Sequence, residues 1–328
     1  LTSYLYFIII LSIIATPRST KLHNWISKIM LSNSNNYPII RDYLYTPVVL
    51  ILFITTIYTI NVRPIQANTR LIDAMISCSG GQNVPSVEAY QNALKLDQYV
   101  ANQEIREQSL ACGTNIIRSN LSQGAKESFA YFVVTNIDKQ INITPNDARA
   151  FYLGGTFLDE AGNWSAANVL LERANQLSPN KQSIMLELAT NYINSNRMSE
   201  AVEITRKAYE LATDNDISRA AYISVLIVSE QEAKAKEVFS KQPEAFYDER
   251  IVNAYMNKKQ FDKAAQIYKK LIENNPENKQ YYLQLAGVYY ASGNKYSTIQ
   301  ELKLIGDKFP ESKKQIDDAI KEVEKKLQ

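Results

Sequence analysis

Side chains that could carry out catalysis are scarce in this chain. The sequence holds one histidine, His23, and two cysteines, Cys78 and Cys112. His23 lies in a short N-terminal loop, so the rest of the chain has no histidine to act as an acid, a base or a triad member. Two thiols and one distant imidazole are too few ligands for a typical zinc site. We therefore predict no catalytic residue and no bound metal.

The glycines and the charges give no sign of a cofactor or nucleic-acid site. Gly80-Gly81 and Gly154-Gly155 lack the spacing of a phosphate-binding loop, and we interpret them as turn and helix-packing glycines. The 36 basic and 34 acidic residues nearly cancel, for a net charge of +2, and basic residues do not alternate with aromatic ones in any patch. We expect no cofactor and no nucleic-acid partner.

The clearest local structure lies near the middle of the chain. Apolar residues recur at helical spacing over 147–161, which predicts an amphipathic helix that Asp147 caps. Gly162-Asn163 supplies a turn, a second helix follows over 164–177, and Pro179 ends it. Because a two-helix hairpin cannot bury its apolar face alone, we expect neighbouring copies.

Residues in and after this hairpin follow a fixed order of large, small and turn positions. The order is set by Phe151, Gly154-Gly155, Leu158, Gly162-Asn163, Ala167, Leu171, Ala174 and Pro179. It resembles the tetratricopeptide repeat (TPR). Further copies are 182–215, 216–242, 245–276 and 279–310, of which 216–242 is eroded and lacks a Gly-Asn turn. The resemblance implies an all-α solenoid of antiparallel helix pairs that serves protein–protein interaction or scaffolding.

Two charge-free runs near the N-terminus predict transmembrane helices. The run 43–62 is long enough to cross a bilayer, whereas 1–15 is short and looks like a helix that has lost its start. The loop between them, 16–42, is rich in Lys and Arg, so the positive-inside rule places it in the cytoplasm and the repeats outside it. A soluble protein with a sticky N-terminus is disfavoured, because the second run carries no charge.

The sequence divides into four predicted parts. They are a membrane anchor with two spans (1–62), a connector with degenerate TPR-like helices (63–146), a regular TPR array (147–310) and a charged C-terminal capping helix (311–328). Pro64 is expected to end the second span, because proline disrupts a helix interior, and a short helix is expected over 71–78.

A second resemblance concerns the N-terminal third of the chain. Two apolar spans around a basic loop are followed by Asn61-Val62-Arg63-Pro64 and by EAYQNALKLD at 88–97. This order is similar to the C-terminal end of O-antigen ligase/polymerase-like membrane proteins that carry TPR tails. In that family a polytopic membrane domain transfers lipid-linked glycan. The resemblance implies an alternative to a scaffold with a two-span anchor: the tail of such an enzyme, with the catalytic part upstream of Leu1.

Cys78 and Cys112 lie 34 residues apart, which is one TPR period. If they occupy equivalent places in successive repeats, their Cα atoms lie farther apart than the roughly 7 Å that a disulfide tolerates. If this region is irregular and outside the cell, a bridge can form. The sequence leaves both possibilities open.

The remaining candidate site is the concave side of the array, which the first helix of each repeat lines. Spacing along those helices predicts contacts from Arg149, Tyr152, Thr156, Asp159, Ser183, Leu186, Thr190, Asn194, Glu249, Asn253, Asn257, Leu283 and Tyr290. This mixed polar surface lacks the run of Lys and Arg that clamps a C-terminal carboxylate, so we do not expect a carboxylate-clamp adaptor. We expect a protein or peptide partner for an integral membrane protein. The sequence does not determine the oligomeric state.

Overall fold

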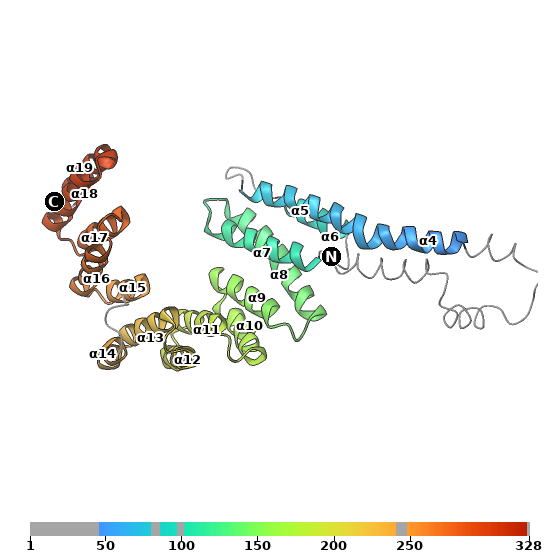
Figure 1. Cartoon of the computed structure of the whole chain (residues 1–328), viewed down its shortest axis with the longest axis horizontal. Coiled ribbons are helices and arrows are strands. Elements are labelled where there is room, and N and C mark those ends of the chain that lie inside the picture. Colours follow the sequence, from blue (N-terminus) through green and yellow to red (C-terminus); the bar gives the residue numbers. More distant parts are fainter. Residues whose placement is uncertain (1–45, 80–85, 97–101, 241–247, 327–328) are drawn as a thin grey trace, which may run out of the picture. The chain divides into compact units, whose positions relative to one another are not determined.

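A computed structural model describes residues 46–79, 86–96, 102–240 and 248–326. Within these ranges the chain forms helices joined by short turns and contains no β-strand, as the predicted all-α class requires (Figure 1). The chain divides into two compact units, residues 1–69 and 70–328. The apolar run 1–15 and the loop that holds His23 lie outside the described residues, so the prediction of a first span stays a prediction.

The described part of the first unit is one long helix, whose last residues, 70–79, belong to the second unit. It begins as α4 (Thr46–Ile57), continues through a π-helical turn, η2 (Tyr58–Val62), and extends into α5 (Arg63–Ser79). Large apolar side chains such as Ile51 and Leu52 are exposed along α4. Among the described residues, the stretch Leu50–Cys78 is the one helix whose length and composition would let it cross a membrane, which is weak evidence that it does so.

The prediction that Pro64 ends this helix is wrong, because the chain stays helical through it. Proline lacks an N–H, and its ring collides with the carbonyl group four residues earlier in an α-helix. The π turn lies directly before Pro64, and the Arg63 N–H donates to the Tyr58 carbonyl oxygen five residues back. This wider turn shifts the hydrogen-bonding register and accommodates the ring. The short helix expected over 71–78 is the last part of α5.

The second unit begins within α5, and the helices that follow pack around aromatic side chains. They are α6 (Val87–Leu96), α7 (Asn102–Arg118) and α8 (Gln123–Ile143). The fully buried Tyr90 ring meets the Phe129 ring edge-on, with 5.9 Å between centroids. A disulfide joins Cys78, near the end of α5, to Cys112, within α7, with Cα atoms 5.9 Å apart. The two cysteines therefore do not occupy equivalent repeat positions, and the bridge that the sequence left open is present.

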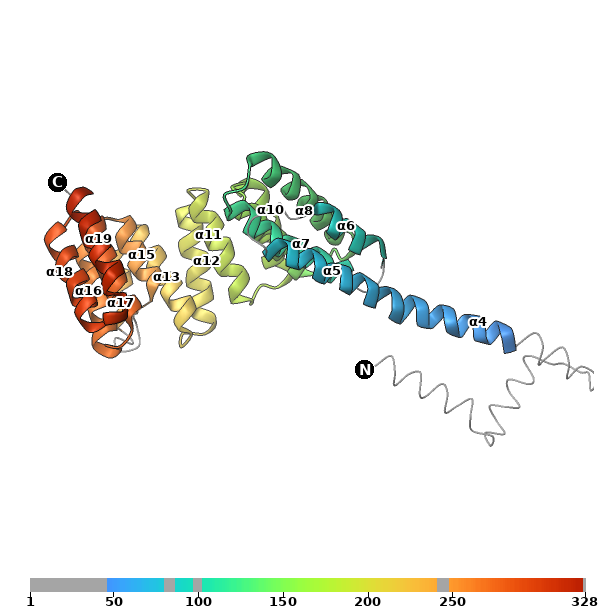
Figure 2. The same ribbon diagram turned by 90° about the horizontal axis from the view of Figure 1, so that it is seen from above.

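Five helical hairpins follow. Their helices are α9 (Ala148–Glu160) and α10 (Trp164–Leu177), α11 (Gln182–Asn194) and α12 (Met198–Leu211), α13 (Asp216–Val228) and α14 (Glu232–Ser240), α15 (Glu249–Asn257) and α16 (Phe261–Asn274), and α17 (Lys279–Ala291) and α18 (Lys295–Lys308). The 3-10 turn η4 (Pro310–Ser312) and α19 (Lys313–Lys326) complete the chain. Figure 2 shows α11 and α12 side by side, as the closely packed members of one hairpin.

Each hairpin turns on one residue with a left-handed backbone. These residues are Gly162, Asn196, Glu230, Lys259 and Gly293, with φ between 56° and 78°, and their spacings are 34, 34, 29 and 34 residues. The third copy, which the sequence shows as eroded, therefore forms a hairpin of the same type, with Glu230 in place of glycine. Its first helix is as long as α9 and α11, but its second helix, α14, has only 9 residues.

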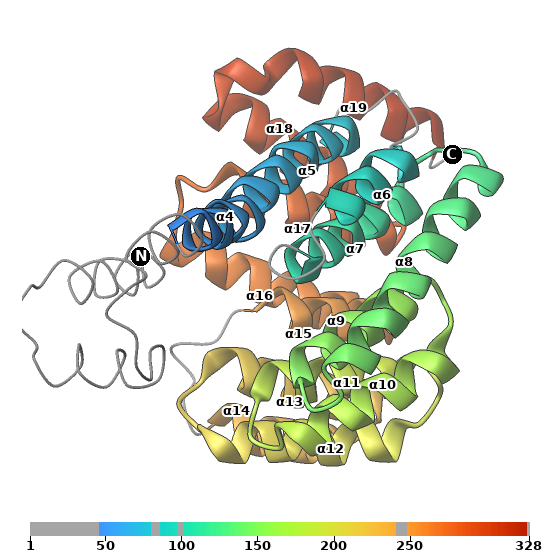
Figure 3. The ribbon, with the colours of Figure 1, turned by 90° about the vertical axis from the view of Figure 1, so that its right-hand side faces the viewer.

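Small residues bring neighbouring helices into close contact, as their positions predicted. A Cβ atom on Gly155 would approach the Leu171 side chain to 2.6 Å, so only glycine fits between α9 and α10. Ala167 and Ala174 of α10 are fully buried. At the C-terminal end, α19 lies beside α18 (Figure 3). It buries Ile316 and Val323 in a cluster with Leu302.

Candidate functional site

A buried polar contact joins the first helices of two successive repeats. The Asp159 carboxylate of α9 is 8% exposed and accepts hydrogen bonds from the Asn191 Nδ2 (2.6 Å) and the Asn194 Nδ2 (2.8 Å) of α11. Asn191 is fully buried and also donates to the Trp164 carbonyl oxygen at 3.0 Å. The predicted contact residues Asp159 and Asn194 therefore bond to each other and fix α11 against α9.

Beside this contact lies a half-buried carboxylate that the sequence analysis missed. Burial raises the pKa of Glu187 on α11, and the charges of Asp159 and Glu160 raise it further, while a hydrogen bond from Thr156 opposes the shift. Burial and the Glu187 charge in turn raise the pKa of Tyr152. The predicted residues Tyr152, Thr156 and Asp159 thus come together around a carboxylate that is costly to ionise without a cation. We call Tyr152, Thr156, Asp159 and Glu187 the acidic cluster.

Residue spacing could have identified Glu187. It lies four positions after Ser183 and three before Thr190, so the same helical face carries all three. In the structure Ser183 and Thr190 are exposed on this face, and Leu186 is half-buried. The face is therefore polar at its edges and acidic where it meets α9.

Two ion pairs connect α9 to α7, the helix before α8. The Arg149 guanidinium lies 2.5 Å from the Glu107 carboxylate, and Arg118 pairs with Glu160 in the same way. The predicted contact residue Arg149 thus has an internal partner, although its side chain remains 65% exposed. The guanidinium groups of Arg149 and Arg118 are thus engaged by Glu107 and Glu160.

The remaining predicted residues form two further groups. Glu249, Asn253 and Asn257 are exposed and lie four residues apart along α15. Leu283 and Tyr290 of α17 line a cleft of about 320 Å³ to which α18 and α19 also contribute. The predicted set therefore makes up three local surfaces, on α9 and α11, on α15, and on α17.

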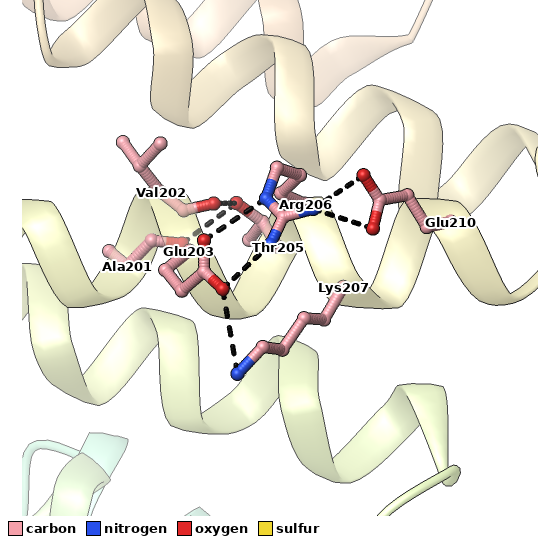
Figure 4. Close-up of polar contacts among 7 residues, drawn as sticks. All are labelled: Ala201, Val202, Glu203, Thr205, Arg206, Lys207 and Glu210. Atoms are coloured by element: carbon pink, nitrogen blue, oxygen red, sulfur yellow. Dashed lines mark hydrogen bonds and ion pairs between the residues drawn. The ribbon is translucent and has the colours of Figure 1, made fainter.

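The second helix of a repeat carries charges of a different kind. On α12, the Arg206 guanidinium binds Glu203 (2.7 Å) and Glu210 (2.5 Å), and Lys207 lies 3.5 Å from Glu203 (Figure 4). These side chains lie one helical turn apart and hold one another in place. The hydrogen bond from Arg206 is the main reason that the pKa of Glu203 is lowered. The carboxylates of this face are thus neutralised, unlike the acidic cluster.

Comparison with known proteins identifies the repeats. Residues 160–208 and 250–278 each match a family model of the tetratricopeptide repeat. A search of curated proteins finds no match. These matches support the predicted TPR identity for the two matched segments, and tetratricopeptide repeats are suited to protein–protein interaction or scaffolding.

Several solved TPR structures are similar at low sequence identity. A tetratricopeptide repeat protein from Parabacteroides merdae is 14% identical, with 79% of this chain and 99% of that chain covered and a TM-score of 0.46. A thermophilic TPR protein from Thermus thermophilus is also 14% identical, with coverages of 56% and 99% and a TM-score of 0.40. YrrB, described as a TPR protein with an unusual peptide-binding site, is 16% identical, with coverages of 53% and 92% and a TM-score of 0.32.

Proposed function

We propose that this tetratricopeptide repeat protein is a membrane-anchored scaffold that binds a basic, extended peptide segment of a partner protein across α9 and α11. The observation that carries the proposal is the half-buried Glu187 carboxylate beside Asp159, whose pKa is raised by burial and by neighbouring negative charge. A Lys or Arg side chain of a partner would neutralise this carboxylate in a partly dehydrated place, where charge-assisted hydrogen bonds are strong.

The rest of the surface suits the same kind of partner. Thr190 and Ser183 offer exposed hydroxyl groups along α11, and Tyr152 offers a half-buried ring with a phenol group. A row of this type can bond to the backbone of an extended peptide while the acidic cluster selects a cationic side chain. The predicted contacts on α15 and α17 would extend the binding surface to further residues of the partner.

Two observations support the proposed location. The exposed apolar side chains of α4 suit a lipid environment, which favours an integral membrane anchor. The disulfide between Cys78 and Cys112 favours an oxidising compartment, because cytosolic reductants keep most protein thiols reduced. We therefore propose that the TPR domain lies outside the cytoplasm. The alternative of a glycan-ligase tail gains no support from the matched TPR segments, and it stays a prediction from the N-terminal sequence.

Binding of a basic peptide to the full chain tests the proposal. The full chain in detergent would be titrated against a fluorescein-labelled peptide of about ten residues with alternating Lys, Ser and Leu, and binding would be followed by anisotropy. Glu187→Gln removes the charge with little change in shape and should weaken binding by about tenfold. Glu324→Gln, at an exposed position on α19, is the matched control.

Three further results test whether the acidic cluster is the binding site. Tyr152→Phe should weaken binding only a few-fold, because the ring that packs against two core clusters is retained. Glu249→Ala should weaken binding if α15 takes part, and circular dichroism should show unchanged helicity. Equal affinity of Glu187→Gln and Glu324→Gln for the peptide, or equal binding of an acidic peptide, would refute the acidic cluster as the binding site.

A further inference from the structure

The chain is shortened between the turns of the third and fourth hairpins. The left-handed turn residues Glu230 and Lys259 are 29 residues apart, whereas the other turns are spaced by 34. Correspondingly, α14 has 9 residues, whereas α10, α12, α16 and α18 each have 14. The next helix, α15, is short as well, with 9 residues where α9, α11, α13 and α17 each have 13.

A groove of about 580 Å³ opens beside the C-terminal half of α14. Its apolar lining comes from Ile223 of α13, Ala235 of α14 and Ile267 of α16, all of them buried, and from the half-buried Tyr255 of α15. Each is part of the core of this region or packs directly against it. The floor can therefore take up an apolar side chain by continuing the core packing outward.

The rim of this groove is positively charged. Lys236, Lys263, Lys269 and Lys270 line it, against the single carboxylate of Glu273. Lys263 pairs with Glu232 at 2.7 Å and Lys270 with Glu273 at 2.6 Å. Lys236 and Lys269 are exposed and form no ion pair with any residue in the described ranges, and the Lys269 ammonium lies over the Tyr289 ring, 6.0 Å from its centroid. Two ammonium groups at the rim are thus available to an incoming anion.

We propose that this groove, which we call the lysine-rimmed groove, binds an acidic peptide segment that inserts one aromatic or branched aliphatic side chain. The apolar floor supplies the pocket for that anchor, and Lys236 and Lys269 pair with carboxylates that flank it in the peptide. The apolar floor is the reason to favour a peptide over a nucleic acid, which would need stacking faces and phosphate contacts along a longer basic track. The charge of this groove is opposite to that of the acidic cluster, so the two sites select different segments.

The test uses the full chain in detergent and a labelled peptide of about 12 residues with Glu and Asp around one Phe and one Leu. A charge-swapped peptide with Lys in place of each acid is the ligand control. Anisotropy should show at least about tenfold tighter binding of the acidic peptide, and the affinity should fall several-fold as NaCl is raised from about 50 mM to about 300 mM.

Matched variants assign the binding to this groove. Lys236→Glu with Lys269→Glu should weaken binding of the acidic peptide by about tenfold or more. Lys234→Glu with Lys303→Glu makes the same charge change at exposed positions outside the groove, on α14 and α18, and should leave the affinity within about twofold. These two double variants have the same net charge, so any difference in their affinity for the acidic peptide comes from where the changed residues lie.

A second pair of variants keeps the charge and fills the groove. Gln266→Trp places a large ring in the groove and should abolish insertion of the anchor, whereas Gln300→Trp places it at the equivalent exposed position one repeat later. Both should retain the wild-type melting temperature. Equal affinity of the Gln266→Trp and Gln300→Trp variants would overturn the proposal. Binding of anionic lipid vesicles, but not of the acidic peptide, through Lys236 and Lys269 would overturn it as well.

Discussion

The Asp159 carboxylate accepts a 2.6 Å hydrogen bond from the Asn191 side chain, across two helices and 32 residues of sequence. Both groups are buried, so neither can exchange its partner for water. Two consecutive repeats are thus held in register by a polar contact inside an apolar interface.

Removing one member of this pair should destabilise the array. Asp159→Ala removes the carboxylate that the two asparagine amides share and leaves Asn191 only its bond to the Trp164 carbonyl oxygen, so it should lower the free energy of unfolding by about 2 kcal/mol. The measurement is thermal unfolding followed by circular dichroism, with Thr190→Ala at an exposed position of α11 as the control. If both variants melt at the wild-type temperature, the contact does not stabilise the packing of α9 and α11.

The pKa of Glu187 predicts a pH dependence of stability. The folded state raises this pKa above its ordinary value of 4.5, so the native protein binds more protons than the unfolded chain between the two values. The contribution of Glu187 to stability therefore falls as the pH rises through that window and stays low above it. Gln cannot ionise, so the Glu187→Gln variant does not lose stability as the pH rises. The melting temperature of the variant minus that of the wild type should therefore be larger at pH 7 than at pH 4. A constant difference at both pH values would contradict the shift.

Replacing glycine by alanine should have opposite effects on stability at two positions in the first helices of the repeats. Gly155→Ala forces a Cβ atom against Leu171 and should cost about 1–3 kcal/mol through overpacking. Gly287→Ala, within α17, meets no atom within 4 Å and should stabilise the helix by about 0.5–1 kcal/mol. Chemical denaturation of the two variants measures both effects. Destabilisation of similar size at both positions would mean that helix packing is not what requires Gly155.

Loss of the disulfide should weaken the N-terminal part of the second unit. Cys78→Ser with Cys112→Ser removes a link that closes a loop over 34 positions and should cost about 3 kcal/mol in the helices that it joins. Hydrogen exchange should speed up in α5 and α7 and remain unchanged in α17. A reductant should reproduce the effect in the wild type and have none in the double variant. Unchanged exchange in α5 and α7 would show that the bridge adds no stability there.

The hairpins with glycine turns were predictable from sequence, because Gly162 and Gly293 suit left-handed backbone positions that other residues enter at a cost. Glu230 and Lys259 hold the same conformation without any such signal, since packing of the flanking helices imposes it. The third repeat looked eroded because it is short and lacks a Gly-Asn turn, whereas 245–276 was recognised from its other positions. The prediction that Pro64 ends the helix failed for a related reason. It rested on residue type, whereas the π turn before Pro64 depends on which main-chain groups hydrogen-bond to one another.

The candidate site was predicted in part. Helical spacing placed Tyr152, Thr156 and Asp159 on one face, but it did not reveal that Asp159 would be buried by asparagines of the next repeat. The role of Glu187 depends on how closely α9 and α11 approach, which no single helix encodes. The lysine-rimmed groove takes its lining from α13, α14, α15 and α16, so the sequence of any one helix does not reveal it.

The bridge between α5 and α7 also changes how the chain can be pulled or cut. Tension applied through the apolar helix at its N-terminal side reaches α7 directly through the sulfur atoms, so α6 and the segments around it carry none of the load. A protease that cleaves between Cys78 and Cys112 would leave the two fragments covalently joined. The segment around α6 can thus be nicked without detaching the repeats from the helix that precedes them.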